Sequence, residues 1–198
     1  MTRAVPSLCL ARNIELNYRL YLPMKKILPL VCALGILNLS LGIAAEPLAP
    51  GLTGEYFDLG TDLDGFPTIA ADKKPTLKRV DKNLNFRSTA MTFPDTKLQS
   101  HFAIRWTGKI RIPKVGKYTF FLESDDGSRL LLDGKQVVDN GGLHEMQVDS
   151  GTVELKAGDH DLKVDYFENE NDGGAGCVLS WKAEGLAKEV VPESALFH

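Results

Sequence analysis

Two oxygen-rich segments carry the residue types best suited to binding chemistry. The first is Asp125-Asp126-Gly127-Ser128, and the second runs from Glu168 to Gly174 with the sequence Glu-Asn-Glu-Asn-Asp-Gly-Gly. Ca²⁺ prefers six to eight oxygen ligands from carboxylates, amides, carbonyls and water, at about 2.3–2.6 Å. Asp, Asn and Gly are also ordinary turn residues, so a hairpin turn with solvated carboxylates and a polar loop without a ligand are the simpler interpretations. From these residues alone, both interpretations stay open.

Other kinds of site are less well supported by the sequence. Glu123 with Asp125 or Asp126 could form a glycosidase acid pair, but such a pair lies about 5–10 Å apart across a cleft, whereas these acids cluster on one turn. The segment Asp62-Leu63-Asp64-Gly65 resembles the start of a calcium loop, but it lacks the later acid of an EF-hand and is expected to be a turn. Zinc-type spacing is missing among the four histidines, which are His101, His144, His160 and His198. We therefore expect a protein that is not an enzyme.

The N-terminal region has the pattern of a secretory signal peptide. Met24-Lys25-Lys26 precedes an apolar run from Ile27 to Ile43, which ends in Ala44-Ala45. A signal anchor is the alternative, but the run is short for a membrane span and contains Pro29 and Asn38. We expect residues 24–45 to be a signal peptide, residues 1–23 to be an over-called start or a disordered extension, and residues 46–198 to be exported. The destination would be the periplasm, the cell surface or the medium, with no membrane span left after cleavage.

Export changes the charge and cysteine counts. Removal of residues 1–45 takes five Lys or Arg and one Glu from the 23 basic and 26 acidic residues, which leaves 18 and 25 and a net charge of −7. An acidic chain excludes a duplex nucleic-acid binder with a basic face and suits cations and neutral or sugar ligands. Cys177 becomes the lone cysteine, so no internal disulfide is expected, and its thiol is expected to be buried.

The region after residue 50 reads as a series of short strands. Phe102 to Ile112 alternates apolar and polar residues for eleven positions, as a half-buried strand does. A turn at Pro113 to Gly116 leads into Lys117 to Ser124, and Asp133-Gly134 predicts a tight hairpin. The other predicted strands are Arg129–Leu132, Gln136–Asp139, Thr152–Leu155, Asp161–Phe167 and Cys177–Trp181.

The pattern of turns and strands predicts an all-β fold, a single-domain antiparallel sandwich or barrel. The stretch 58–97 is the least regular and is expected to form loops and short strands that wrap the sheet. Trp106 and Trp181 lie on the apolar faces of their strands, so we expect them in the core rather than stacked on a sugar.

An ordered series of motifs resembles the protective-antigen-type β-domain (the PA-fourteen domain), which is named from anthrax protective antigen and also occurs in yeast flocculins and bacterial glycosidases. The series begins with Gly-Leu-Thr-Gly-Glu-Tyr-Phe at 51–57 and continues with Phe-Ala-Ile-Arg-Trp-Thr-Gly at 102–108 and Gly-Lys-Tyr-Thr-Phe at 116–120. It ends with Ser-Asp-Asp-Gly-Ser-Arg-Leu-Leu-Leu-Asp-Gly at 124–134, Leu-Lys-Ala-Gly-Asp-His at 155–160, Tyr-Phe-Glu-Asn at 166–169 and Leu-Ser-Trp at 179–181. The resemblance covers residues 51–196, and the order of the motifs makes it specific.

The resemblance implies a twisted antiparallel β-sandwich or barrel that works as a binding module. In sugar-binding members, two consecutive Asp residues joined by a cis peptide hold Ca²⁺, an Asn side chain and backbone carbonyls complete the protein ligands, and two sugar hydroxyls bind the ion. The matching residues here are Asp125 and Asp126, with Asn169 or Asn171 as the Asn and Asp172 as a weaker further ligand.

The resulting expectation is an exported, non-catalytic, calcium-dependent carbohydrate-binding module whose partner is a glycan or cell-surface polysaccharide. The alternative is a metal-independent structural or interaction module of the cell envelope that packs on another exported protein.

Overall fold

Twelve β-strands and one short 3₁₀ helix form the described part of the chain, which in this computed structural model comprises residues 47–89, 92–170 and 174–198. The strands are β1 (Leu52–Asp58), β2 (Leu77–Asp81), β3 (Asn85–Thr89), β4 (Phe102–Ile112), β5 (Gly116–Asp125), β6 (Ser128–Leu132), β7 (Lys135–Asn140), β8 (Gln147–Leu155), β9 (Gly158–Glu168), β10 (Ala175–Ala183), β11 (Leu186–Val190) and β12 (Leu196–Phe197), and the 3₁₀ helix η1 spans Glu193–Ala195.

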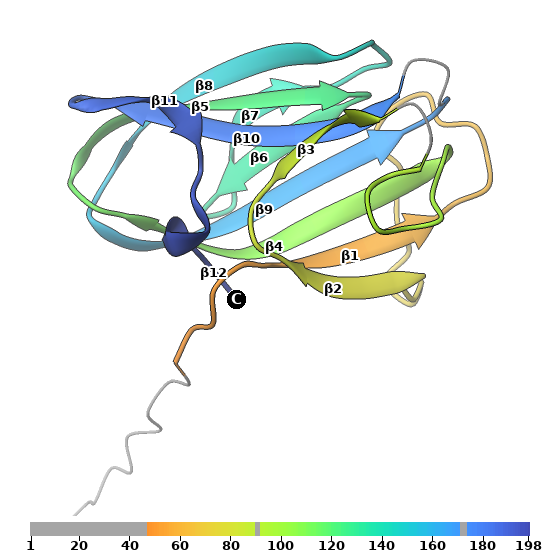
Figure 1. The fold of residues 1–198 in the computed structure, drawn as a ribbon, viewed down its shortest axis with the longest axis horizontal. Helices are drawn as coiled ribbons and strands as arrows, with labels where there is room; N and C mark the ends of the chain where they lie inside the picture. Colours follow the sequence, from red (N-terminus) through yellow and green to blue (C-terminus); the bar gives the residue numbers. More distant parts are fainter. Residues whose placement is uncertain (1–46, 90–91, 171–173) are drawn as a thin grey trace, which may run out of the picture. The chain divides into compact units, whose positions relative to one another are not determined.

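The strands form two antiparallel sheets that pack face to face as a sandwich (Figure 1). The seven-stranded sheet has the order β2-β1-β4-β9-β6-β7, with β12 paired to β4, and we call it sheet A. The five-stranded sheet has the order β11-β10-β5-β8, with β3 paired to β10, and we call it sheet B. The predicted all-β sandwich is therefore confirmed.

Alternation of apolar and polar side chains explains why the central strand pair of sheet A has one face in the core and one face toward solvent. The strand β4 has the predicted limits and pairs with β9 from Phe102 opposite Glu168 to Ile112 opposite Gly158. Its apolar side chains at alternate positions are buried, and the polar side chains between them face outward. The partly exposed outer residues form cross-strand ion pairs, such as Arg105 Nε to Asp165 Oδ1 at 2.9 Å.

The core lies between the two sheets and is rich in aromatic rings. Trp106 is fully buried and Trp181 is 3% exposed, which confirms that both tryptophans belong to the core. Cys177 is also buried, as expected, and burial raises the pKa of its thiol. Apolar burial of this kind is the main stabilising contribution to a sandwich without a disulfide.

Two differences separate the observed strands from the predicted ones. The strands from β5 to β10 all extend beyond their predicted limits at one or both ends. β1 and β11 were not predicted as strands, and β11 has no buried residue that would reveal its parity. The stretch 58–97 supplies β2 and β3 with irregular segments around them, as expected, although it is partly outside the described residues.

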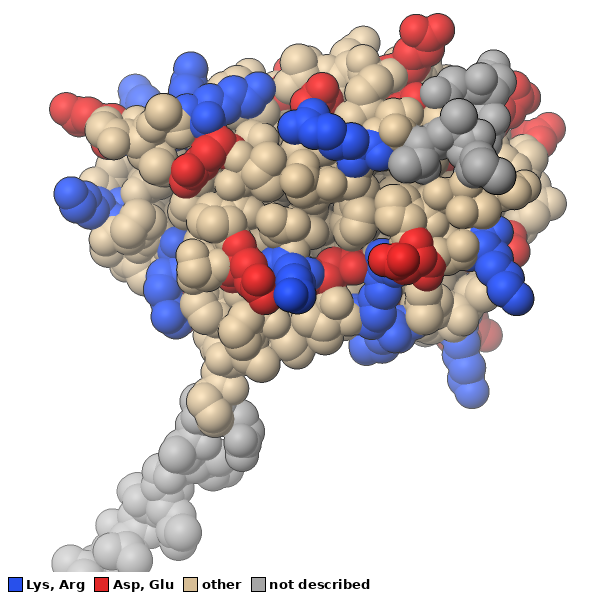
Figure 2. Space-filling view, viewed as in Figure 1, with Lys and Arg blue, Asp and Glu red and all other residues tan. Residues whose placement is uncertain are grey.

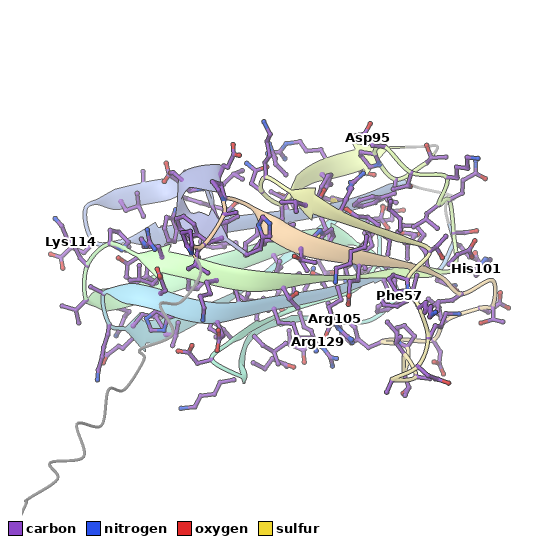
Figure 3. All side chains as sticks on the ribbon, turned by 90° about the horizontal axis from the view of Figure 1, so that it is seen from below. Phe57, Asp95, His101, Arg105, Lys114 and Arg129 are labelled. Atoms are coloured by element: carbon purple, nitrogen blue, oxygen red, sulfur yellow. The ribbon has the colours of Figure 1, made fainter. Side chains whose placement is uncertain are left out.

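Three connections between the sheets meet at one end of the sandwich. Asp126-Gly127 joins β5 of sheet B to β6 of sheet A, residues 141–146 join β7 to β8, and residues 169–174 join β9 to β10. The register places them together, because Asp125 lies opposite Gly176 and Ser128 lies opposite both Tyr166 and Asn140. We call this the crossover end. His101 lies at this end in Figure 3, and Lys114, in the β4–β5 turn, lies at the other end, which we call the hairpin end.

No helix in the part of the chain that the structure describes is long and apolar enough to cross a membrane. The predicted signal peptide at residues 24–45 and the extension at residues 1–23 lie outside the described residues.

Candidate functional site

The consecutive aspartates lie at the crossover end, where the chain passes from one sheet to the other. Asp125 is the last residue of β5, and its peptide bond to Asp126 is cis, as the family resemblance implies. Both residues are largely buried, with 6% and 7% of their surface exposed. Two buried carboxylates on one connection are not a solvated hairpin turn, so that simpler interpretation is wrong.

The Asp126 carboxylate links the other two crossover connections. Its Oδ1 accepts a hydrogen bond from the backbone N–H of His144 at 2.7 Å, and its Oδ2 accepts one from the backbone N–H of Asn169 at 2.9 Å. An ionised carboxylate is an acceptor with about four lone-pair positions, so both oxygens keep capacity for a cation. Asp126 is therefore held rigidly by backbone groups from two different loops.

Asn169 is close to the aspartates, as the resemblance implies for the ligating Asn. It is 8% exposed, and its backbone carbonyl accepts a hydrogen bond from the N–H of His101 at 2.9 Å. Its side-chain Oδ1 accepts the backbone N–H of Leu63 at 2.6 Å. This bond connects the Asp62–Gly65 segment to the site, which the sequence alone did not suggest. Asn171 and Asp172, the other predicted ligands, lie outside the described residues.

Glu168 is a component of the site that the sequence analysis placed in the loop and did not single out. It is the last residue of β9 and is fully buried. Its Oε2 accepts hydrogen bonds from the backbone N–H of Asp126 at 3.0 Å and from the Tyr166 hydroxyl at 3.1 Å. Its Oε1 has no hydrogen-bond partner among the described residues.

Burial, together with the negative charges of Asp126 and Asp125, raises the pKa of the Glu168 carboxyl to about 9. The signal that could have identified Glu168 is strand parity, because it continues the inward-facing series of Leu162, Val164 and Tyr166.

Gly127 allows this close arrangement. A Cβ at this position would lie 2.4 Å from Cε1 of Phe167 and 3.0 Å from the carbonyl oxygen of Gly142. Its own carbonyl accepts the N–H of Phe167 at 2.9 Å. The missing side chain therefore lets the β5–β6 connection lie close to strand β9 and to the β7–β8 connection.

A cavity of about 300 Å³ opens beside the aspartates, and we call it the Asp pocket. Its size is at the lower limit of small-ligand sites. It is lined by Asp125, Asp126, Leu143, His144, Glu145, Asn169 and Glu170.

The donors at the Asp pocket fit a hard cation such as Ca²⁺. They are carboxylate and amide oxygens, with no thiolate and no free imidazole, because both ring nitrogens of His144 lie within hydrogen-bond distance of backbone carbonyls. Burial first, and then the negative charges of Asp126 and Asp125, raise the pKa of the neighbouring Glu168 carboxyl, so two carboxylate charges lie close together here. No group of three or more His, Cys, Asp or Glu residues is arranged as a metal site within residues 47–89, 92–170 and 174–198. A complete ligand set therefore needs amide or carbonyl oxygens, water or residues 171–173.

Comparisons with known proteins agree with this architecture. The PA14 domain family matches residues 48–195. Anti-sigma-I factor RsgI3 of Acetivibrio thermocellus is 30% identical over 149 residues, which cover 74% of this chain and 21% of that protein. The chain therefore spans about a fifth of the length of this curated relative.

Solved structures show the same fold. An anti-sigma factor domain-containing protein is 27% identical with a TM-score of 0.64, and the match covers 75% of this chain and 47% of that chain. The PA14 sugar-binding domain of an RTX adhesin is 20% identical with a TM-score of 0.63, and the match covers 76% of this chain and 99% of that domain. The family match extends over most of the chain, from β1 to η1, and the chain belongs to the PA14 domain family.

Proposed function

We propose that this protein is an exported carbohydrate-binding module that uses Ca²⁺ at the Asp pocket. The observation that carries the proposal is the convergence of Asp125, Asp126 and Asn169 beside a cavity of about 300 Å³. The proximity of the Asp125 and Asp126 charges to buried Glu168 is the second support, because a bound cation would compensate those charges.

Each residue has a distinct role in the proposal. The carboxylates of Asp125 and Asp126 are the principal metal ligands, and Asn169 or Asn171 with Asp172 complete the protein contribution. The backbone N–H groups of His144 and Asn169 orient the Asp126 carboxylate before a ligand arrives. Ca²⁺ bound there would offer coordination positions to two neighbouring sugar hydroxyls. A preorganised site of this kind needs little rearrangement on binding.

Two parts of the proposal, export and sugar binding, are supported by the sequence and by similar proteins. The signal-peptide pattern at residues 24–45 supports export. The RTX adhesin domain, with the same fold, is a sugar-binding domain. The acidic charge of residues 46–198 is compatible with a neutral glycan and opposes binding to nucleic acid.

A second candidate function is a metal-independent module that binds another exported protein. It is favoured by the two backbone hydrogen bonds to Asp126, because a carboxylate that links two loops by hydrogen bonds has a structural role without a metal. The similarity to anti-sigma factors also supports this candidate, since the matched region is only part of those proteins.

Thermal unfolding of the purified chain in chelator, in Ca²⁺ and in Mg²⁺ separates the two candidates. A site occupied at a hundredfold excess over Kd adds about 2.7 kcal/mol to the free energy of unfolding. For a domain of this size, that gain raises the midpoint by about 5–10 °C. We expect a calcium-selective rise, followed by calcium-dependent signal on a glycan array.

The matched variants are Asp126→Asn and Asp149→Asn. Asp149 lies on the exposed β8 and serves as the control for loss of one carboxylate. Asp126→Asn also disturbs two hydrogen bonds and so changes stability without a metal. The quantity to compare is therefore, within each variant, the difference between the unfolding midpoint in calcium and the midpoint in chelator. This difference should vanish in Asp126→Asn and persist in Asp149→Asn. No calcium effect in the natural chain would overturn the calcium proposal and favour the protein-binding candidate.

A further inference from the structure

The rim of the Asp pocket carries an exposed apolar side chain. Leu143, in the β7–β8 connection, is 53% exposed, although leucine side chains are normally buried. Val80, Val115 and Val148 are the other large apolar residues with high exposure among the described residues, and none of them lines the Asp pocket. A sugar ring has an apolar C–H face beside its hydroxyls, and Leu143 offers a surface for that face next to the oxygen ligands.

The rim also carries two carboxylates that have no counterion. Glu145 and Glu170 are exposed, and neither forms an ion pair within the described ranges. Among the described residues that line the pocket, four carry carboxylates and none is Lys or Arg. A divalent cation on Asp125 and Asp126 would balance two of these charges and leave the two rim carboxylates uncompensated.

The outer face of sheet A is a contrast to the pocket rim, because carboxylates on its central strands form cross-strand ion pairs. There, Arg111 pairs with Asp159 at 2.7 Å, Lys109 pairs with Asp161 at 2.6 Å, and Asp165 accepts Arg105, Arg129 and Lys163. In Figure 3, Arg105 and Arg129 lie close together on neighbouring parts of this sheet. In Figure 2, basic side chains lie beside acidic ones in a band across the middle of the visible face. The carboxylates of Asp159, Asp161 and Asp165 are therefore paired, whereas, among the described residues, those of Glu145 and Glu170 are not.

We infer that Leu143, Glu145 and Glu170 set the specificity of the Asp pocket, so that it accepts neutral and amino-bearing sugars and rejects anionic ones. The inference rests on the proposed sugar-binding function and adds the class of sugar. Uronic, sulfated or phosphorylated sugars bring a negative charge to a rim that already has two. A protonated amino group meets the same carboxylates favourably.

The test uses a glycan array in which each backbone is present in three forms: neutral, amino-bearing and oxidised to the uronic acid. The array is probed with the purified chain in Ca²⁺ at low and high NaCl. We expect the uronic form to bind about tenfold more weakly than the neutral form of the same backbone, because one like-charge contact at partly exposed positions has that effect. High salt should bring the affinities of the neutral and uronic forms closer together, since the Debye length falls from about 30 Å at 0.01 M to about 8 Å at 0.15 M.

The charge variant is the double substitution Glu145→Gln with Glu170→Gln, and the control is Glu154→Gln on the exposed β8. The double variant should bring the uronic and neutral forms close to equal affinity, and the control should leave the ratio unchanged. The apolar contact is tested by Leu143→Ala, which should weaken all three forms several-fold, with Val148→Ala as the control of similar exposure. A general loss of folding would be excluded by unchanged unfolding midpoints.

The outcomes separate the inference from the function on which it rests. If no backbone binds in any form, both the sugar-binding function and the inference fail. If neutral sugars bind but uronic forms bind equally well, or if the double variant leaves the ratio unchanged, the specificity inference fails and the sugar-binding function stands. A ratio that depends on Glu145 and Glu170 and on salt supports both.

Discussion

The strand β6 is flanked at both ends by the same dipeptide, and the two ends differ in almost every physical respect. Asp126-Gly127 precedes the strand at the crossover end, and Asp133-Gly134 follows it at the hairpin end. Asp126 is 7% exposed, whereas the Asp133 side chain is 51% exposed. Asp133 and Gly134 have positive φ values of 48° and 76°, as in a tight two-residue hairpin. Gly127 instead serves a close approach to Phe167.

The charges around the two aspartates differ as well. At the hairpin end, the Asp133 carboxylate accepts a hydrogen bond from Nδ1 of His160 at 2.6 Å, and this contact lowers the pKa of Asp133. At the crossover end, Asp126 lies beside Asp125 and Glu168, and burial, together with the negative charges of Asp126 and Asp125, raises the pKa of Glu168 to about 9. One end therefore carries a satisfied turn, and the other carries negative charge that a ligand can compensate. Local sequence does not distinguish them, but tertiary neighbours do.

The largest expected effect is on the pH dependence of stability at the crossover end. Glu168 has a folded pKa of about 9 against an ordinary value of 4.5, so between these values the folded state holds one more proton than the unfolded state. The free energy of unfolding therefore falls as pH rises, by up to about 1.4 kcal/mol per pH unit and by up to about 4 kcal/mol between pH 5 and pH 8. Urea unfolding in chelator across this range measures the slope.

The matched variant for this prediction is Glu168→Gln, which keeps the shape and removes the titration. Its stability should change less between pH 5 and pH 8 than that of the natural chain. Groups with lowered pKa values, such as Asp133 and Asp165, complete their titration below this window and do not interfere. Parallel pH profiles in the two proteins would contradict a buried, protonated Glu168.

The next largest effect is the loss of stability on replacing Gly127 or Gly134, the glycines at the two ends of β6. Gly127→Ala would bring a Cβ to 2.4 Å from the ring of Phe167, so the core must shift, and we expect a loss of about 2–3 kcal/mol. Gly134→Ala meets no atom within 4 Å, but its φ of 76° disfavours a side chain, and we expect a loss of about 1 kcal/mol. Chemical denaturation of both variants gives the comparison.

Gly65→Ala is the control for the glycine pair, because its Cβ meets no neighbour within 4 Å and its backbone has no positive φ. It should leave stability nearly unchanged. Equal losses for Gly127→Ala and Gly134→Ala would mean that the crossover end is less tightly packed than the distances indicate.

The regular parts of the fold could be predicted because their physical cause is local. The eleven-residue alternation of β4 reveals which side chains face the core, and it correctly assigned Trp106. The Asp133-Gly134 turn was predictable because two residues determine its backbone conformation. The β11 strand was not, since its pairing with β10 is set by the partner strand and its own residues show no buried face.

The site was predictable only in part. The family resemblance selected Asp125, Asp126 and either Asn169 or Asn171, with Asp172 as a weaker ligand. The structure brings Asp125, Asp126 and Asn169 together, and the other two lie outside the described residues. The hydrogen bond between Asn169 and Leu63 joins residues 106 positions apart, so no local pattern could reveal it. The burial of Glu168 follows from the parity of β9, but its raised pKa depends on Asp125 and Asp126 from another strand connection. Non-local electrostatics is the part that the sequence leaves undetermined.

The smallest expected effect concerns the ion pair at the hairpin end. Asp133 raises the pKa of His160, whose Nε2 also lies 2.9 Å from the carbonyl oxygen of Lys156. Because the folded pKa is raised, this pair stabilises the protein fully below the ordinary histidine value of 6.5 and loses its contribution as pH rises through the folded pKa. Its partial exposure and screening limit the contribution to below about 1 kcal/mol.

Asp133→Asn tests this pair, and Asp62→Asn provides the matched control. Asp62 also contacts a histidine, His101 at 3.1 Å, but its side chain is 93% exposed, so its loss should cost almost nothing. NMR titration should show a lower pKa for His160 in Asp133→Asn, together with a smaller stability advantage at pH 6 relative to pH 8. An unchanged His160 titration would show that the Lys156 carbonyl alone holds the proton. The two ends of β6 would then differ in burial and also in this respect, because only the aspartate at the crossover end would shift the pKa of a neighbouring side chain.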